Sequence, residues 1–170
     1  KAPKYMLFSL FDRQIIPLKL SLELQQWRNS LLEPPTDYGA LPDLLRPYQK
    51  RGVAWLAHLF EKDCHALLAD EMGLGKTLQA AALIDCRPIT GMRHLVVCPA
   101  SVVPVWKNEL SKYFPHLRTE ILKSNHNFVI NPEPVIWLSS YTQLRRHKVL
   151  LREIEFGYAV LDEAQLIKYP

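Results

Sequence analysis

The chain has 170 residues, of which 48% are hydrophobic and 22% charged, and its net charge is +4. This length and balance fit a single globular domain and exclude a low-complexity or collagen-like chain. The small positive charge is compatible with a polyanionic partner but does not by itself select nucleic acid.

The cysteines and the lengths of the apolar runs indicate the cellular compartment of the protein. Cys64, Cys86 and Cys98 lack zinc-type spacing, so we expect reduced thiols rather than a metal site. No apolar run approaches the roughly 20 residues of a membrane helix, and the N-terminus has no secretory pattern. We therefore expect a cytoplasmic protein with no membrane partner. Because the chain begins at Lys1 and ends at Pro170, just past an acidic motif, we also expect it to be part of a longer protein.

The N-terminal part of the chain predicts one strand and one helix. Residues 5–11 form an apolar, strand-like run. Apolar residues then recur at helical spacing, which predicts an amphipathic helix containing Leu20, Leu24, Trp27 and Leu31. The breaker-rich residues 34–37 end this pattern. We predict a boundary here, between an N-terminal extension, residues 1–37, and a nucleotide-binding lobe, residues 38–170.

A phosphate-binding turn follows the next predicted helix, which begins at residues 46–49. Apolar residues 66–69 predict a buried strand, and Gly73, Gly75, Lys76 and Thr77 then open a new helix. Glycine lets backbone N–H groups approach phosphates, and the start of a helix attracts anions. We expect Lys76 to reach the β- and γ-phosphates of ATP and Thr77 to coordinate Mg²⁺.

Apolar strands and amphipathic helices alternate through the rest of the chain. The expected strands are residues 94–98, 119–122, 135–139 and 158–161, and the expected helices run from the phosphate turn to about 87, from about 102 to 114 and from 141 to 155. This alternation predicts an α/β fold with a parallel sheet flanked by helices. Ligands of such sheets bind beyond the carboxyl ends of the strands.

Two adjacent carboxylates follow the last predicted strand. In an ATPase, Asp162 would hold Mg²⁺ through its water shell, and Glu163 would orient and polarise the attacking water. Taken alone, such a pair is also typical of a solvated helix cap. The phosphate turn earlier in the chain favours the ATPase interpretation.

Motifs beyond residue 38 resemble the Swi/Snf-type branch of superfamily-two helicases, and in particular its N-terminal RecA-like lobe, a P-loop NTPase fold. These are Leu45-Arg46-Pro47-Tyr48-Gln49, Asp70-Glu71-Met72-Gly73-Leu74-Gly75-Lys76-Thr77, Cys98-Pro99-Ala100-Ser101 with Trp106 and Glu109, and Asp162-Glu163-Ala164-Gln165. Asp70 stands where the general P-loop pattern has Gly, and this family commonly has Asp there. Gln165 replaces the more frequent His and resembles bacterial members.

The resemblance implies a double-stranded-DNA translocase driven by ATP and Mg²⁺ in the nucleoid. Its partners would be a second RecA-like lobe of the same parent chain and DNA-bound protein complexes. Because the sequence contains no second lobe, we expect this chain alone to be inactive or nearly so. The family's next strand, which normally lies between the phosphate-turn strand and the Asp162 strand, is also absent. We therefore expect a gap at the centre of the sheet, with marginal stability or association as its consequence.

The resemblance also implies roles for single residues. Lys76 and Glu163 would be catalytic, and Gln165 would couple the ATP site to the second lobe. Gln49 resembles an adenine-reading glutamine, whose amide can donate and accept at once, and Arg46 and Tyr48 would support the base or the loop. The residues near the DNA backbone would be Ser101, Lys107, Ser140 and Tyr141.

Several alternatives stay open at this point. Trp106 shares a helical face with Leu110 and Phe114, which favours a core position over a DNA contact. The basic residues 145–148 are typical of a solvated helix face, with DNA tracking as the other interpretation. A superfamily-two RNA helicase lobe and a non-catalytic nucleotide-dependent interaction module remain alternatives for the whole chain.

Overall fold

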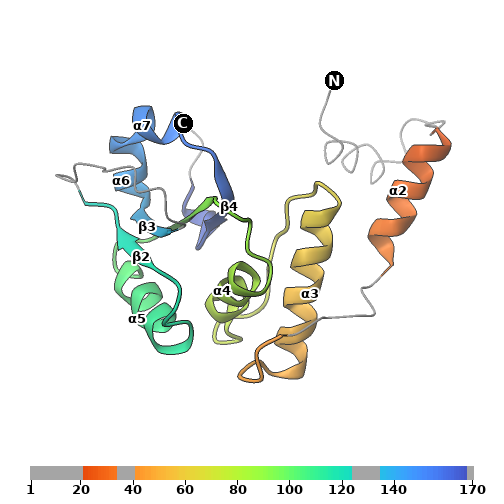
Figure 1. Cartoon of the computed structure of the whole chain (residues 1–170), viewed down its shortest axis with the longest axis horizontal. Helices are drawn as coiled ribbons and strands as arrows, with labels where there is room; N and C mark the ends of the chain where they lie inside the picture. The colour runs from red at the N-terminus through yellow and green to blue at the C-terminus, as the bar shows by residue number, and fades with distance from the viewer. Residues whose placement is uncertain (1–20, 34–40, 124–134, 168–170) are drawn as a thin grey trace. The chain divides into compact units, whose positions relative to one another are not determined.

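Figure 1 shows the computed structural model of the chain, which describes residues 21–33, 41–123 and 135–167. Contacts divide the chain into two compact units, residues 1–79 and 80–170. This division does not test the predicted boundary at residue 37, which stays a prediction. The strand predicted for residues 5–11 lies outside the described residues. None of the described helices is both long and apolar enough to cross a membrane.

The helices and strands follow the predicted order closely. The first unit contains α2 (Leu22–Leu32) and α3 (Pro47–Glu61), and α4 (Lys76–Cys86) begins in it and continues into the second. The second unit then contains β1 (Arg93–Cys98), α5 (Val103–Tyr113), β2 (Thr119–Ile121), β3 (Ile136–Ser140), α6 (Tyr141–Arg146), α7 (Lys148–Arg152), β4 (Phe156–Leu161) and the 3-10 turn η2 (Ala164–Leu166).

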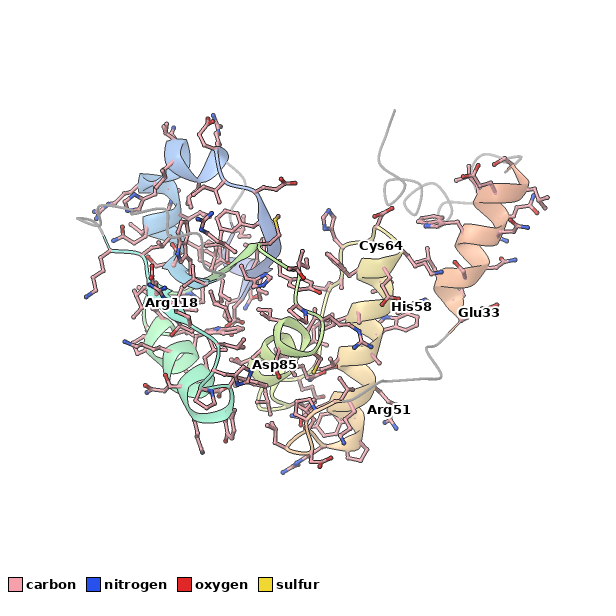
Figure 2. The ribbon with its side chains drawn as sticks, in the orientation of Figure 1. Glu33, Arg51, His58, Cys64, Asp85 and Arg118 are labelled. Atoms are coloured by element: carbon pink, nitrogen blue, oxygen red, sulfur yellow. The ribbon has the colours of Figure 1, made fainter. Side chains whose placement is uncertain are left out.

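Helix α2 lies alongside α3 in the first unit. The Trp27 indole nitrogen donates to the Lys62 carbonyl oxygen at 3.2 Å. His58, which is labelled in Figure 2, lies on α3, and its ring nitrogen Nε2 is 2.9 Å from the carbonyl oxygen of Ser30. Leu31 of α2 is buried. The predicted amphipathic helix is therefore confirmed for Leu24, Trp27 and Leu31, whereas Leu20 lies outside the described residues.

The second unit contains a parallel sheet with the strand order β2-β3-β1-β4. Leu95 of β1 is paired with Trp137 of β3 on one side and Ala159 of β4 on the other. Because all strands run the same way, their carboxyl ends share one edge of the sheet, where Asp162 follows β4. The predicted α/β fold with a parallel sheet is confirmed.

Helices cover both faces of this sheet, as parallel strands require. Figure 1 shows α5 on one side of the strands and α6 and α7 on the other. Leu95, Val97 and Trp137 form one buried cluster with α6 and α7 residues. Side chains alternate along a strand, so Val96 and Leu138 point to the opposite face. That face meets α5, which contacts β2 and β3.

The strand predicted for residues 66–69 is wrong. Residues 64–71 belong to no helix or strand, and Leu67 is 83% exposed. A strand needs a neighbour for its backbone N–H and C=O groups, and none of the described strands pairs with this segment. Residues 66–69 are exposed or half-buried, so the predicted burial is wrong as well. The described strands pair continuously, so the expected gap does not separate any two of them.

The single helix predicted for residues 141–155 is also wrong. The chain forms α6 and α7, which are separated by His147 with ψ of 15°. The ring of His147 lies 3.2 Å from the Lys123 carbonyl oxygen, a contact that ties the break to the segment after β2. In one continuous helix the like charges of Arg145 and Lys148, three residues apart, would also lie on the same face and repel one another. The side chains of residues 145–148 are exposed or half-buried, so a solvated basic face is observed.

A buried histidine joins β1 to β4. His94 Nδ1 accepts a hydrogen bond from the Tyr158 backbone N–H at 3.1 Å, so the ring is held in its neutral form. Burial lowers the pKa of His94 below its usual value. A Cβ on Gly157 would lie 3.0 Å from His94 Cε1, so the glycine makes room for the ring.

We predict that His94 makes the stability of the fold depend on pH. The unfolded chain takes up a proton on this ring near pH 6.5, whereas the folded chain resists it. The free energy of unfolding therefore keeps this contribution above pH 6.5 and loses it as the pH falls through the lowered folded value. Urea unfolding between pH 5 and 8 should show a shallower pH slope for His94→Gln, which keeps an acceptor, than for the wild type. An unchanged slope for His94→Gln, or an equal effect of exposed His65→Gln, would contradict this.

Candidate functional site

Two glycines shape the loop before α4. Gly73 and Gly75 have φ of +89° and +73°, which side chains with a Cβ rarely adopt. The Gly75 carbonyl accepts the first helical hydrogen bond, from the Gln79 N–H at 3.0 Å. The N–H groups of the first turn have no partner within a helix, so they are available to an anion.

The Lys76 side chain is hydrogen-bonded to the backbone of this loop. Its ammonium lies 2.7 Å from the Asp70 carbonyl oxygen and 3.0 Å from the Glu71 carbonyl oxygen. An ammonium has three N–H donors, so one remains for a ligand. The predicted phosphate-binding lysine is thus held on the loop that would surround the phosphates.

The N-terminus of α3 holds the same loop through the Leu74 carbonyl. This oxygen lies 3.3 Å from Tyr48 Oη and 3.2 Å from Gln49 Nε2, and both groups donate to it. A Cβ on Gly75 would lie 2.4 Å from Gln49 Nε2, so glycine is needed for space as well as for its positive φ. Tyr48 thus contacts the loop, which is one of the two supporting roles predicted for it from the sequence.

Gln49 is buried, and both ends of its amide contact the chain. Its Oε1 accepts from the Arg46 backbone N–H at 2.9 Å, while its Nε2 donates to Leu74. An amide can make further bonds at both atoms, so the predicted adenine contact stays a prediction. The Arg46 side chain is exposed. The geometry adds a second role, in which Gln49 connects the start of α3 to the loop.

Asp70, the departure from the general P-loop pattern, is tied to α4. Its Oδ2 accepts from Gln79 Nε2 at 3.2 Å, and the Gln79 side chain is completely buried. A glycine at position 70 could not make this bond. Sequence reasoning missed Gln79, which lies one helical turn after Lys76 on the buried side of α4. A Cβ on Gly52 would lie 2.0 Å from Gln79 Oε1, so Gly52 lets α3 approach this amide closely.

We predict that restoring the general pattern weakens the protein. Asp70→Gly removes the nearer acceptor of the buried Gln79 amide and leaves it only the Leu74 carbonyl oxygen at 3.5 Å, which costs about 1 kcal/mol of unfolding free energy. Asp70→Asn is the matched control, because its side-chain oxygen can still accept from Gln79. Urea denaturation should rank the variants wild type, Asn, Gly. Equal midpoints for Asn and Gly would show that the hydrogen bond is unimportant.

The acidic end of β4 is built by contacts from several elements. The Asp162 N–H donates to the Val97 carbonyl oxygen at 2.8 Å, which extends the pairing with β1 past the strand. Tyr141 Oη donates to the Asp162 carbonyl oxygen at 2.7 Å. The Asp162 carboxylate accepts from Trp106 Nε1 at 2.8 Å and from the Glu163 N–H at 3.0 Å. The backbone and the side chain of Asp162 are therefore both fixed.

The charge of Asp162 is not neutralised by a cationic side chain. Among the described residues its carboxylate forms no ion pair, and its hydrogen-bond donors are neutral groups. Burial raises the pKa of Cys98 to about 11, and the Asp162 charge adds to this rise. Burial and the same charge raise the pKa of Tyr141. A half-buried, unpaired carboxylate with free lone pairs fits Mg²⁺, which takes few protein ligands and keeps its waters.

Glu163 has a strained backbone. Its φ and ψ are 53° and 46°, the left-handed conformation that is uncommon for residues other than Gly. The Glu163 side chain is exposed, and its carboxylate accepts a hydrogen bond from Gln165 Nε2. The predicted coupling residue thus contacts the predicted catalytic one. Such strained positions cluster at functional sites.

We predict that this strain can be measured by comparing two substitutions. Glu163→Gly relieves it, whereas Glu163→Ala keeps it, and both remove the carboxylate. Glu163→Gly should therefore exceed Glu163→Ala in unfolding free energy by about 1 kcal/mol, measured in urea. An alanine variant as stable as the glycine variant would contradict the left-handed conformation.

The residues predicted to lie near DNA fall into two groups. Ser101 and Lys107, at the start of α5, are exposed. The Ser140 hydroxyl instead caps α6 by accepting from the Gln143 N–H at 3.2 Å, and the Tyr141 hydroxyl is used by Asp162. Trp106 is 1% exposed, so its predicted core position is confirmed, but its bond to Asp162 was not foreseen.

Comparison with known proteins decides the family. The sequence model of the SNF2-related domain matches residues 48–170, which include the loop, Asp162 and Glu163. The chain belongs to the SNF2-related domain family. It is 38% identical over 146 residues, 73% of its length, to the chromatin-remodeling ATPase INO80 of Arabidopsis thaliana, of which it covers 9%. It is 33% identical over 182 residues, 97% of its length, to an uncharacterized ATP-dependent helicase, MG018, of Mycoplasma genitalium, of which it covers 17%.

A solved structure supports the same family and the fold. The SWI2/SNF2 ATPase core of Sulfolobus solfataricus in complex with dsDNA aligns with a TM-score of 0.68 and 39% identity, over 82% of this chain and 29% of that one. The SNF2-related chain spans between 8% and 20% of the length of its curated relatives. These relatives include plant, fungal and bacterial proteins, so the resemblance to bacterial members stays a prediction.

Proposed function

We propose that this chain is the ATP-binding half of a Swi/Snf-type double-stranded-DNA translocase. The proposal is carried by the loop before α4, in which Gly73 and Gly75 have positive φ and the Lys76 ammonium donates to backbone carbonyl oxygens of the same loop. Polyphosphate is the anion that such a loop fits best. The unpaired carboxylate of Asp162 supplies the ligand that the accompanying Mg²⁺ needs.

The chemistry of each site residue suits it to a different role in binding or hydrolysing ATP. The loop N–H groups and Lys76 bind the β- and γ-phosphates, and Gln49 with Arg46 supports the adenine end. Thr77 and Asp162 would hold Mg²⁺, which neutralises charge on the phosphates when it is bound. Glu163, exposed beside Asp162, orients the attacking water and accepts its proton.

Hydrolysis and movement along DNA are proposed for the complete protein. An arginine finger contributes about 10³–10⁵ in rate, and we place it, as in the family, on a second RecA-like lobe, to which Gln165 couples. This chain alone should therefore hydrolyse ATP negligibly. Duplex DNA as the partner is supported by the solved relative that holds dsDNA and by exposed Ser101 and Lys107, with Ser140 and Tyr141 as further candidates. Remodelling of DNA-bound proteins in the nucleoid completes the proposal.

We predict saturable, Mg²⁺-dependent binding of a fluorescent, non-hydrolysable ATP analogue to this chain. Lys76→Ala removes the phosphate-binding ammonium and should weaken binding at least about 10-fold, because a hydrogen bond to a charged group contributes about 1.5–3 kcal/mol. Fluorescence anisotropy at fixed Mg²⁺ measures the affinity. Lys107→Ala, an exposed lysine on α5 outside the loop, is the matched control and should bind as the wild type does. Binding that is absent, or equal in Lys76→Ala and the wild type, would overturn the proposal.

A further inference from the structure

The hydrogen bond between Trp106 and Asp162 is not explained by packing alone. Trp106 lies on α5 and is 1% exposed, and its Nε1 is 2.8 Å from Asp162 Oδ2. The two residues are separated by 56 positions in the chain, so this bond joins α5 to the end of β4. A bond from a neutral donor to a carboxylate is shorter and stronger than one between neutral groups.

The other contacts of Asp162 leave its side chain free to turn. Val97 and Tyr141 bind its backbone, through the N–H and the carbonyl oxygen. The Glu163 N–H binds Oδ1 from the adjacent residue, so it moves together with Asp162. Among the described residues, only Trp106 holds the carboxylate from a separate and buried element. The indole therefore decides how the carboxylate is oriented.

The orientation matters because of the remaining lone pairs. Oδ2 uses one lone pair to accept from the indole N–H, and Oδ1 uses one to accept from the Glu163 N–H. The remaining lone pairs of both oxygens are available to a cation or to its water shell. Neutral donors fix the carboxylate without cancelling its charge, whereas a lysine or arginine would compete with the cation.

We propose that Trp106 is a positioning residue for the metal-binding carboxylate of Asp162. This inference rests on the proposed function, because it assigns the metal to the same site. Trp106 does not touch nucleotide or metal. It acts by holding Asp162 Oδ2, so that the divalent cation finds the carboxylate already oriented.

Trp106→Phe removes the N–H but keeps an aromatic ring in the core. Partners that orient a metal ligand typically change metal affinity about 10- to 100-fold when they are removed. In the variant, the Mg²⁺ concentration at half-maximal binding of the ATP analogue should rise about 10-fold or more. The weaker affinity for the analogue that remains in EDTA should be the same in the variant and the wild type, because the loop and Lys76 are intact. A purely structural role would weaken both, and this result would overturn the inference.

Trp137→Phe is the matched control for the loss of a buried indole. Trp137 is 2% exposed and lies in the cluster with Leu95 and Val97, on β3 rather than α5. This variant should keep the Mg²⁺ dependence of the wild type. Equal shifts in Trp106→Phe and Trp137→Phe would overturn the positioning role. Circular dichroism and urea midpoints establish that both variants are folded before they are compared.

A nucleotide-free measurement separates this inference from the proposed function. In ¹H–¹⁵N spectra of the chain, the indole N–H of Trp106 is assigned by its loss in Trp106→Phe. Asp162→Asn should shift it strongly and leave that of Trp137 in place, and Mn²⁺ alone should broaden it in the wild type but not in Asp162→Asn. If the ATP analogue fails to bind while Mn²⁺ gives this pattern, the proposed function falls and the positioning role stands. An indole resonance insensitive to Asp162→Asn or to Mn²⁺ would overturn the positioning role even where the analogue binds.

Discussion

The parallel pairing of β4 with β1 is the constraint on which the acidic part of the site depends. It continues one residue beyond the strand through the bond from the Asp162 N–H to the Val97 carbonyl oxygen. This brings Asp162 to the carboxyl edge of the sheet, within reach of the Trp106 indole and the Tyr141 hydroxyl. The chain then turns sharply at Glu163, in a strained conformation that the adjacent contacts must maintain.

The phosphate loop is held by side-chain hydrogen bonds rather than by strand pairing, because no described strand leads into it. Side chains from the start of α3 and from α4 hold it instead. Tyr48 and Gln49 bind the Leu74 carbonyl, and the buried Gln79 binds the Asp70 carboxylate. The loop is therefore shaped by residues outside the general P-loop pattern and by the Asp that stands in place of its first Gly.

The sequence predicted most elements because their periodicity reflects burial on both faces of the sheet. The strands β1, β3 and β4 and the helix α5 lie within about two residues of their predicted bounds. Periodicity failed for residues 66–69, since a short apolar run does not reveal whether a pairing partner exists. It also failed at His147, where a contact with Lys123, distant in the chain, accompanies the helix break. In the site, the phosphate loop and the acidic pair could be predicted from their residue types and spacing. The bonds of Trp106 and Gln79 could not, because they join residues on different elements or on a buried helix face.

The central claim is that the loop before α4 binds the phosphates of ATP. The most direct measurement follows the Gly75 amide in ¹H–¹⁵N spectra while Mg²⁺ and a non-hydrolysable ATP analogue are added together. We expect a saturable shift of this resonance, and we expect Lys76→Ala to move its midpoint to higher concentration. A Gly75 amide that does not respond, or a midpoint that is the same in Lys76→Ala and the wild type, would contradict the claim.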